Sequence, residues 1–372
     1  MSVIDDNWIE KIWNRLHTKL LRVAVERRGT LPYSTDENGV YDDKYKTYVN
    51  FWTNGFWPGL MWLMYEGTHN EEYRITAENA EKLLDDALKN YDLLDHDMGF
   101  MWHLSSGANY RITGNKDSYI RNMYAANILA GRYNIKGGYI RAWQDEDKKG
   151  YAIIDCMMNL PLLYWASVET GDDRYKNIAV SHADKTLMHH VRDDGSVHHI
   201  VNYNPENGEV LNYPTGQGYQ SGSSWSRGQA WAIYGFTLSF IHTHDEKYLN
   251  VAKKVANYFI AACCDDYLPK SDFRSPPEPI VYDSSAGLIA ANGLIELSRN
   301  LPETERIMYY NAALKLIKTI TDTFADWSDD TDAIITHCSQ YYSAYKHITM
   351  VYADYYLAEA LNKLKGINTF LW

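Results

Sequence analysis

A short segment recurs five times in this chain, and every copy has the pattern of a helix start. The copies end at Tyr73, Tyr119, Tyr175, Tyr248 and Tyr309, at intervals of 46, 56, 73 and 61 residues. Each copy has Thr or Pro, then acidic residues in the first turn, then apolar residues at helical spacing. Three copies carry Ala on the apolar stripe, where small side chains let helices pack closely. The repeat therefore predicts one helical unit that occurs several times.

Further helical stretches lie between the copies, so the repeating unit is predicted to be a helical hairpin. Alternating strand patterns are rare, although the segment 196–204, before NPENGEV, is predicted to form a short β-hairpin. Twelve helices in six hairpins are expected, pairing 7–27 with 52–67, 71–91 with 98–110, 117–132 with 151–169, 173–190 with 226–243, 246–264 with 283–299, and 304–325 with 349–364.

Six hairpins can stack as an open solenoid or close into a barrel of inner and outer helices. Solenoids keep a fixed period and simple loops, whereas the spacing here varies and the loops are long and rich in Trp, Tyr, Gly and His. We therefore expect an all-α closed barrel, as a single domain over residues 1–372, because no Pro- or Ser-rich linker divides the chain. The loops 28–51, 133–150, 191–225 and 265–282 are expected to meet at one end and form a pocket.

Charge and composition exclude several classes of function. The formal net charge of −12 lacks the basic surface that nucleic-acid binding requires, although a few local Arg or His residues could still hold a small anion. No apolar run is long enough to cross a bilayer, and the start MSVIDDNWIEK lacks the apolar core of a signal peptide. Four cysteines without ligand spacing fit a reducing compartment. We expect a cytoplasmic monomer or weak homodimer that binds neither nucleic acid nor membrane.

The histidine and cysteine patterns do not match any common metal or cofactor motif. The His pairs 189–190 and 198–199 lack HExxH or Cys-x-x-Cys partners, and no P-loop, Gly-x-Ser-x-Gly or dinucleotide fingerprint occurs. We therefore expect neither a metal nor an organic cofactor. What remains is a set of carboxylates among 12 Trp and 31 Tyr, and flat aromatic faces beside paired carboxylates are typical of sites that act on sugars.

The apolar stretch from Tyr151 to Trp165 contains a single carboxylate, Asp155. The predicted helix over 151–169 places it in the first turn, on the same face as Asn159. A carboxylate in apolar surroundings must find partners, face a polar cavity or have a raised pKa. A helix cap or a hydrogen-bonded core Asp is the alternative interpretation. Because carboxylates beside aromatic residues recur elsewhere in the chain, we interpret Asp155 as catalytic.

A second group of polar residues, Asp95, His96 and Asp97, precedes the predicted helix at 98–110. An Asp at such a turn is commonly a helix cap, and this alternative stays open. Three tryptophans are spaced by five residues in WTNGFWPGLMW. Trp52 begins this segment and is a candidate for a cavity mouth, whereas Trp57 and Trp62 are expected to pack in the core.

Two loops carry the remaining candidates. In DGSVHHIVNYN, neighbouring residues of an extended segment point to opposite sides, so at most one of His198 and His199 faces a given site. In TGQGYQSGSSWSRGQAWAIYGF, a Gly- and Ser-rich loop containing Gln217 leads into a helix that begins near Trp225 and contains Arg227 and Trp231. Helix N-terminal amides and an Arg could hold a carboxylate there, and a capped helix with a surface Arg is the alternative.

In their order along the chain, WTNGFWPG, HDMGF, IRAW, IIDCMMNLPLL, HHIVNYNPENGE, TGQGYQSGSSWSRGQAWAIYGF and DSSAGLIAANGLIEL resemble the unsaturated glucuronyl hydrolases of glycoside hydrolase family 88. The resemblance spans about 47–300 and implies an (α/α)6 barrel. It implies Asp155 as the acid/base and Asp97 as the second carboxylate. It also implies contacts with an unsaturated uronate from His199, Gln217, Arg227 and Trp231, stacking platforms at Trp52 and Trp143, and His96 as a further substrate-binding residue.

The resemblance also implies a reaction. The expected partner is a di- or oligosaccharide produced by a polysaccharide lyase, from which a 4,5-unsaturated uronate is released by hydration of its double bond. A related unsaturated rhamnogalacturonyl hydrolase, an ordinary inverting glycosidase on the same barrel and a helical-repeat interaction protein are the alternatives. The segment Ser339 to Lys346 departs by one residue at each gap from the family's sulfate-binding Ser-x-x-Ser-x-Lys pattern, so a preference for sulfated sugars is not implied.

Overall fold

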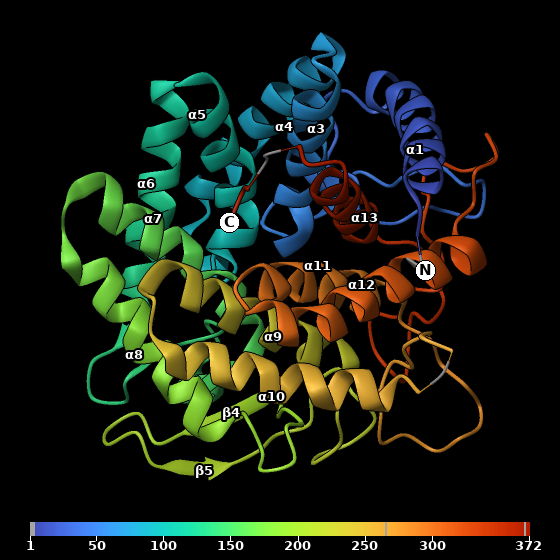
Figure 1. The fold of residues 1–372 in the computed structure, drawn as a ribbon. Helices are drawn as coiled ribbons and strands as arrows, with labels where there is room; N and C mark the ends of the chain where they lie inside the picture. Colours follow the sequence, from blue (N-terminus) through green and yellow to red (C-terminus); the bar gives the residue numbers. More distant parts are fainter. Residues whose placement is uncertain (1–3, 265, 368–369) are drawn as a thin grey trace.

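The computed structural model describes residues 4–264, 266–367 and 370–372. Within these ranges the helices form an outer and an inner ring (Figure 1). The outer ring contains α1 (Asp6–Glu26), α4 (Glu71–Lys89), α6 (Lys116–Gly131), α8 (Asp173–His189), α10 (Glu246–Ala262) and α12 (Glu303–Phe324). The inner ring contains α3 (Phe56–Thr68), the π-helix η3 (Gly99–Gly107) with α5 (Ala108–Thr113), the short 3-10 helix η5 (Ile154–Met158) with α7 (Leu160–Thr170), α9 (Ser226–Thr243), α11 (Ser284–Arg299) and α13 (Val351–Leu364).

Contacts between neighbouring inner helices close the ring. The helix α3 packs on η3, and α7, α9 and α11 follow in order until α13 packs back on α3. The outer helices α4, α8, α10 and α12 pack on the inner helices α3, α7, α9 and α11. All six predicted hairpins are present, and the predicted all-α (α/α)6 barrel is confirmed.

Burial explains which helix of each hairpin lies inside. An outer helix such as α1 buries one stripe, from Ile12 to Ala24 at intervals of one or three residues, and leaves its other face in solvent. By contrast, α9 is buried continuously from Ser226 to Ser239, and α11 from Ser284 to Ser298. A helix that is apolar on all sides must be surrounded by other elements, so these sequences form the inner ring.

The recurring segment forms the junction between an inner helix and the next outer helix. The prediction that its Thr starts the outer helix is wrong, because each Thr is the last residue of the inner helix. A residue in the left-handed conformation follows, and then Asn or Asp accepts a hydrogen bond from a backbone N–H of the outer helix. The four junctions are Thr68–His69–Asn70, Thr113–Gly114–Asn115, Thr170–Gly171–Asp172 and Thr243–His244–Asp245.

Short strands and long loops occupy the side of the barrel where the inner helices begin (Figure 1). The strands β4 (Ile200–Tyr203) and β5 (Val210–Asn212) form the predicted hairpin, and β3 (Tyr151–Ile153) pairs with β4. A second small sheet joins β1 (Tyr133–Asn134) to β2 (Tyr139–Ile140). The remaining short elements are α2 (Lys44–Thr47), η1 (Trp52–Gly55), η2 (Tyr91–Leu93) and η4 (Glu146–Lys148). In the described part of the chain, every helix is too short or too polar to span a membrane.

Candidate active site

A cavity of about 480 Å³ lies where the inner helices begin and contains both predicted catalytic carboxylates. A hollow of about 600 Å³ between α4 and α6 is larger, but none of the predicted site residues lines it. The smaller cavity is lined by residues from six separate segments of the chain: Phe51, Trp52, Asp95, Asp97, Trp143, Lys148, Tyr151, Ile153, Asp155, His199, Ile200, Pro214, Thr215, Gly216, Gln217, Gln340 and Tyr341.

Asp155 lies on a 3-10 turn between a strand and a helix. The prediction of a continuous helix over 151–169 is wrong, because Tyr151–Ile153 pairs with β4 and α7 begins only at Leu160. Pro161 near the start of α7 lacks a backbone N–H, which a helix tolerates in its first turn but not in its interior. The strand therefore delivers Asp155 to the cavity, and the helix that follows is fully buried up to Ser167.

His199 is the partner of the Asp155 carboxyl group. Its Nε2 lies 3.4 Å from Asp155 Oδ2, and both side chains are largely buried. Burial raises the pKa of Asp155, but the neighbouring His199 and the positive charge of Arg227 outweigh burial and hold this pKa below its ordinary value. Of the three outcomes expected for a carboxylate in apolar surroundings, Asp155 therefore finds partners, and its pKa is lowered rather than raised.

Asp97 has the opposite electrostatic environment. Burial raises its pKa well above the ordinary value, and the nearby carboxyl groups of Asp95 and Asp155 raise it further. Burial also raises the pKa of Asp95, to about 6, and lowers that of His96 to about 3, so His96 is neutral at pH 7. At a pH between the lowered pKa of Asp155 and the raised pKa of Asp97, Asp97 is therefore protonated and Asp155 is ionised.

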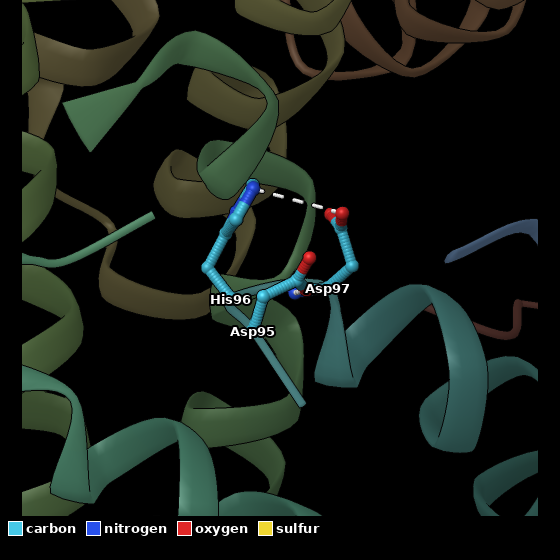
Figure 2. Close-up of side chains that lie close together, drawn as sticks. All are labelled: Asp95, His96 and Asp97. Carbon is cyan, nitrogen blue, oxygen red and sulfur yellow. Dashed lines mark hydrogen bonds and ion pairs between the residues drawn. The ribbon is translucent and has the colours of Figure 1, made fainter. Parts of the chain in front are cut away.

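Asp95 and His96 both support Asp97. The Asp97 backbone N–H donates to Asp95 Oδ1 at 2.8 Å, and His96 Nε2 lies 3.6 Å from Asp97 Oδ2. Figure 2 shows the imidazole ring and the Asp97 carboxyl group facing each other. The alternative that Asp97 is only a helix cap is not supported, because η3 begins without a side-chain cap.

The same three residues offer three oxygen or nitrogen atoms within 4.8 Å of one another, as a metal site would require. They are consecutive in the sequence, however, and two of them already contact the third. We therefore assign this cluster to the support of Asp97, and no other group of metal-ligand side chains occurs in the described part of the chain.

Asn159 connects the two segments that carry Asp97 and Asp155. Its Nδ2 donates to Asp97 Oδ1 at 3.1 Å and lies 3.5 Å from the carbonyl oxygen of Asp155. Its Oδ1 accepts the backbone N–H of Phe100 at 2.8 Å, which fixes the start of η3. A side chain added at Gly99 would collide with Asn159, so this glycine is required for the close approach. Asn159 thereby holds Asp97 and Asp155 in one fixed arrangement.

The cavity walls contain three more of the predicted site residues. Trp52 is half-buried and packs on Phe100 and Tyr352, with ring centroids 5.4 and 5.2 Å apart. Trp143 also lines the cavity, with its ring centroid 6.1 Å from that of Tyr151. The backbone N–H of Gln217 donates to His199 Nδ1 at 3.1 Å, which orients the imidazole so that Nε2 faces Asp155. His198 stacks instead on Tyr213, as the alternation along the strand predicts.

Three predicted ligand residues do not line the cavity. Arg227 is 1% exposed, and its guanidinium donates to Asp283 and to the backbone carbonyls of Ser339 and Gln340. Trp231 is fully buried, with its ring 5.1 Å from that of Phe100. His96 is fully buried behind Asp97. The predicted contact of Arg227 and Trp231 with a ligand is therefore not seen in this structure, because core partners already surround both side chains.

Several lining residues were missed by sequence reasoning. Gln340 and Tyr341 belong to the segment between α12 and α13, which we did not predict as part of the pocket. The Gln217 side chain and Arg227 both donate to the Gln340 carbonyl, and this bonding brings the segment to the cavity. Phe51, Lys148 and Tyr151 were also missed, although each neighbours a predicted element and could have been found by its position.

A closed ring of helical hairpins, with two carboxyl groups of opposed pKa and tryptophans around one cavity, defines a sugar-cleaving enzyme, a glycoside hydrolase. The sequence profile described as Glycosyl Hydrolase Family 88 matches residues 29–267. The chain belongs to this family.

Comparisons with characterised proteins agree with the family. The chain is 37% identical over 333 residues to the unsaturated glucuronyl hydrolase of Bacillus sp. (strain GL1), covering 86% of this chain and 88% of that protein. The crystal structure of that enzyme has a TM-score of 0.91 and covers 97% of this chain and 98% of its own. The unsaturated chondroitin disaccharide hydrolase of Streptococcus pneumoniae (strain ATCC BAA-255 / R6) is 35% identical over 320 residues, covering 83% of this chain and 81% of that protein.

A further solved structure holds a sugar. A mutant of the Streptococcus agalactiae unsaturated glucuronyl hydrolase, complexed with dGlcA-GalNAc6S, has a TM-score of 0.85 and 28% identity. The alignment covers 99% of this chain and 94% of that chain.

Proposed function

We propose that this enzyme releases a 4,5-unsaturated uronic acid from the non-reducing end of lyase-generated oligosaccharides of the glycosaminoglycan type. The observation that carries the proposal is the pair Asp97 and Asp155, which line one cavity with pKa values pushed apart. The substrates in the names of the relatives, unsaturated glucuronyl and unsaturated chondroitin disaccharide, support the same sugar class.

The chemistry is hydration of the C4=C5 enol ether. The pair holds one proton between its two pKa values, and the raised pKa of Asp97 places this proton on Asp97 before the sugar binds. A bound uronate brings a second negative charge beside Asp155 and raises its pKa, so the proton is transferred to Asp155. Asp155 then gives this proton to C4, takes one from the water whose oxygen bonds to C5, and leaves a hemiketal. Ring opening forms the C5 ketone, and the hemiacetal at C1 releases the second sugar.

The other side chains position the uronate. Trp52 provides an aromatic face for the uronate, Trp143 provides one for the sugar that follows it, and Gln217 and His199 contact the uronate beside Asp155. Arg227, Trp231 and His96 support the site from behind, Arg227 by its field on Asp155 and by holding the Gln340 carbonyl. We propose that the chain acts as one catalytic domain in the cytoplasm, as a monomer or weak homodimer, without a cofactor.

Turnover in heavy water tests the reaction. An unsaturated uronyl-N-acetylgalactosamine should lose its ultraviolet absorbance, and the keto acid released should carry deuterium at C4, because the proton of Asp155 exchanges with solvent. The saturated disaccharide of the same linkage should not react, since it has no double bond to protonate. Asp155→Asn should reduce kcat by about 10²–10⁴-fold or more, because an amide is neither acid nor base.

Direct glycosidic cleavage gives a different result. An inverting glycosidase attacks C1 and leaves the hydrogens on the ring carbons unchanged. Cleavage of the saturated disaccharide at a comparable rate, with no deuterium at C4, would contradict the proposal. Full activity of the Asp155→Asn variant would remove Asp155 from the mechanism.

A further inference from the structure

One positive side chain lies among the residues that line the catalytic cavity. Asp95, Asp97 and Asp155 supply negative or protonated carboxyl groups, and the imidazole of His199 faces Asp155. Among the lining residues, all of which the structure describes, Lys148 is the only Lys or Arg. An anion in this cavity therefore has one mobile cation available, since the guanidinium of Arg227 is bonded to Asp283.

Lys148 lies at the mouth of the cavity rather than at its floor. Its side chain is 35% exposed, whereas the side chains of Asp97 and Asp155 are 11% and 12% exposed. It ends the short helix η4, in the loop that also carries Trp143, and its Nζ lies 5.3 Å from the centroid of the Trp143 ring. The aromatic face and the ammonium group therefore form one unit at the entrance.

The proposed function fixes which sugar meets this unit. If the unsaturated uronate lies beside the buried carboxyl groups, the second sugar extends outward and lies against Trp143. We propose that Lys148 binds an anionic substituent, a sulfate ester or a carboxylate, on that second sugar, and thereby selects charged disaccharides over neutral ones. This proposal rests on the proposed function.

The present partner of Lys148 is easily exchanged. Its Nζ lies 3.2 Å from Asp145 Oδ2, and the Asp145 side chain is 51% exposed. Ion pairs in solvent contribute little to stability, so replacing Asp145 with a substrate anion costs little. A lysine is a point charge on a flexible stem, so it selects for the charge without requiring one position of the substituent on the ring.

The segment that resembles a sulfate-binding pattern has a different arrangement. Ser339 is fully buried, and its hydroxyl donates to the carbonyl of Tyr282 at 2.7 Å. Lys346 lies over the ring of Tyr342 at 5.4 Å and is not among the lining residues. The cation at the entrance of this cavity therefore comes from the loop at 143–148 and not from 339–346.

Lys148→Met tests the proposal, with Lys149→Met as the matched control. Lys149 is the next residue, is exposed, pairs with Glu146 and does not line the cavity. The kcat/KM values of wild type and both variants should be measured on unsaturated uronyl-N-acetylgalactosamine with and without a sulfate ester, and on an unsaturated disaccharide whose second sugar carries a carboxylate. We expect Lys148→Met to lose about tenfold on at least one charged substrate through a raised KM, as expected for one lost charge-assisted contact, and less than twofold on the neutral one.

The outcomes separate the two proposals. If Lys148→Met loses kcat/KM only on the sulfated substrate, the ligand of Lys148 is a sulfate ester. If it loses kcat/KM only on the carboxylate-bearing substrate, the ligand is a carboxylate. Equal loss on charged and neutral substrates, no loss on either charged substrate, or the same loss in Lys149→Met would overturn the role of Lys148. Failure of the wild type to act on any of the three disaccharides would instead reject the proposed function.

Discussion

Asp97 and Asp155 differ in protonation because their nearest neighbours differ. Asp155 faces the Nε2 of His199 at 3.4 Å, which helps to lower its pKa. Asp97 faces His96 at 3.6 Å, but that imidazole is neutral at pH 7, and the carboxyl groups of Asp95 and Asp155 raise the pKa of Asp97. Two carboxyl groups in one cavity with opposed pKa shifts give a pair that holds a single proton over a wide range of pH. Such a pair can both donate and accept a proton within one turnover.

The pH dependence of kcat/KM should therefore be a plateau with two limbs. Activity falls at low pH when Asp155, whose pKa is lowered, becomes protonated and the pair has no base. Activity falls at high pH when Asp97, whose pKa is raised, loses the shared proton. Asp97→Asn should be severely impaired and should shift the high-pH limb downward, because Asp155 alone then supplies the proton. A rate profile on the unsaturated disaccharide measures both limbs; an unshifted high-pH limb in the variant would contradict the shared proton.

Sequence reasoning found the carboxylates but not the contacts that set their charge. Asp155 could be selected because it is the single carboxylate in an apolar stretch, and Asp97 because of the resemblance to the family. The contacts of Asp97 with Asn159 and of Asp155 with His199 join residues far apart in the chain, so neither local pattern nor composition indicates them. The lowered pKa of Asp155 could not be predicted for the same reason.

At the scale of elements, the junctions between inner and outer helices are the most regular feature of the chain. The sequence indicated where these junctions lie, because caps and left-handed residues depend on local backbone geometry. The strand at Tyr151–Ile153 was predicted as helix, because its partner β4 lies more than 40 residues away and its apolar run suits either structure.

Gly171 provides a test of the junctions. It has a φ of +68° at the end of α7, and a Cβ added there would meet no neighbour within 4 Å. Gly171→Ala should lower the free energy of unfolding by about 1–2 kcal/mol through backbone strain alone. Gly131→Ala in α6 is the matched control, since it also has open space but helical backbone, and it should be neutral or stabilising. Urea unfolding midpoints measure the stability of both variants. An equal loss of stability in Gly171→Ala and Gly131→Ala would exclude the left-handed backbone of Gly171 as the cause.

For the whole molecule, closure of the ring depends on a side chain near its centre. Trp372 is 1% exposed, lies parallel to the ring of Tyr356 on α13 and contacts Tyr234 on α9 and Phe100 in η3. Its Nε1 donates to Glu359 at 2.9 Å, and Glu359 also lies 3.5 Å from Lys363. One indole group thus fills the space between three inner helices.

Trp372→Ala should lower the free energy of unfolding by about 3–5 kcal/mol, because it leaves a cavity and removes a partner of a buried carboxyl group. Trp372→Phe keeps most of the packing and should lower the free energy of unfolding by much less. Denaturant unfolding of both variants gives the two values. If the two variants lower the free energy of unfolding equally, the hydrogen bond to Glu359, and not the volume that the indole fills, would be the main contribution of Trp372 to stability.

All the inner helices begin on the side of the barrel that contains the cavity, and this orientation has an electrostatic consequence. Each helix start carries roughly half a positive elementary charge from its aligned peptide dipoles, an effect that fades within about one turn. Helix starts near the cavity, such as the one that follows Asp97, therefore add partial positive charges that belong to the backbone and do not appear in the net charge of −12. We therefore expect the negative net charge to act on an anionic sugar at long range, and the backbone dipoles to act on it only within the cavity.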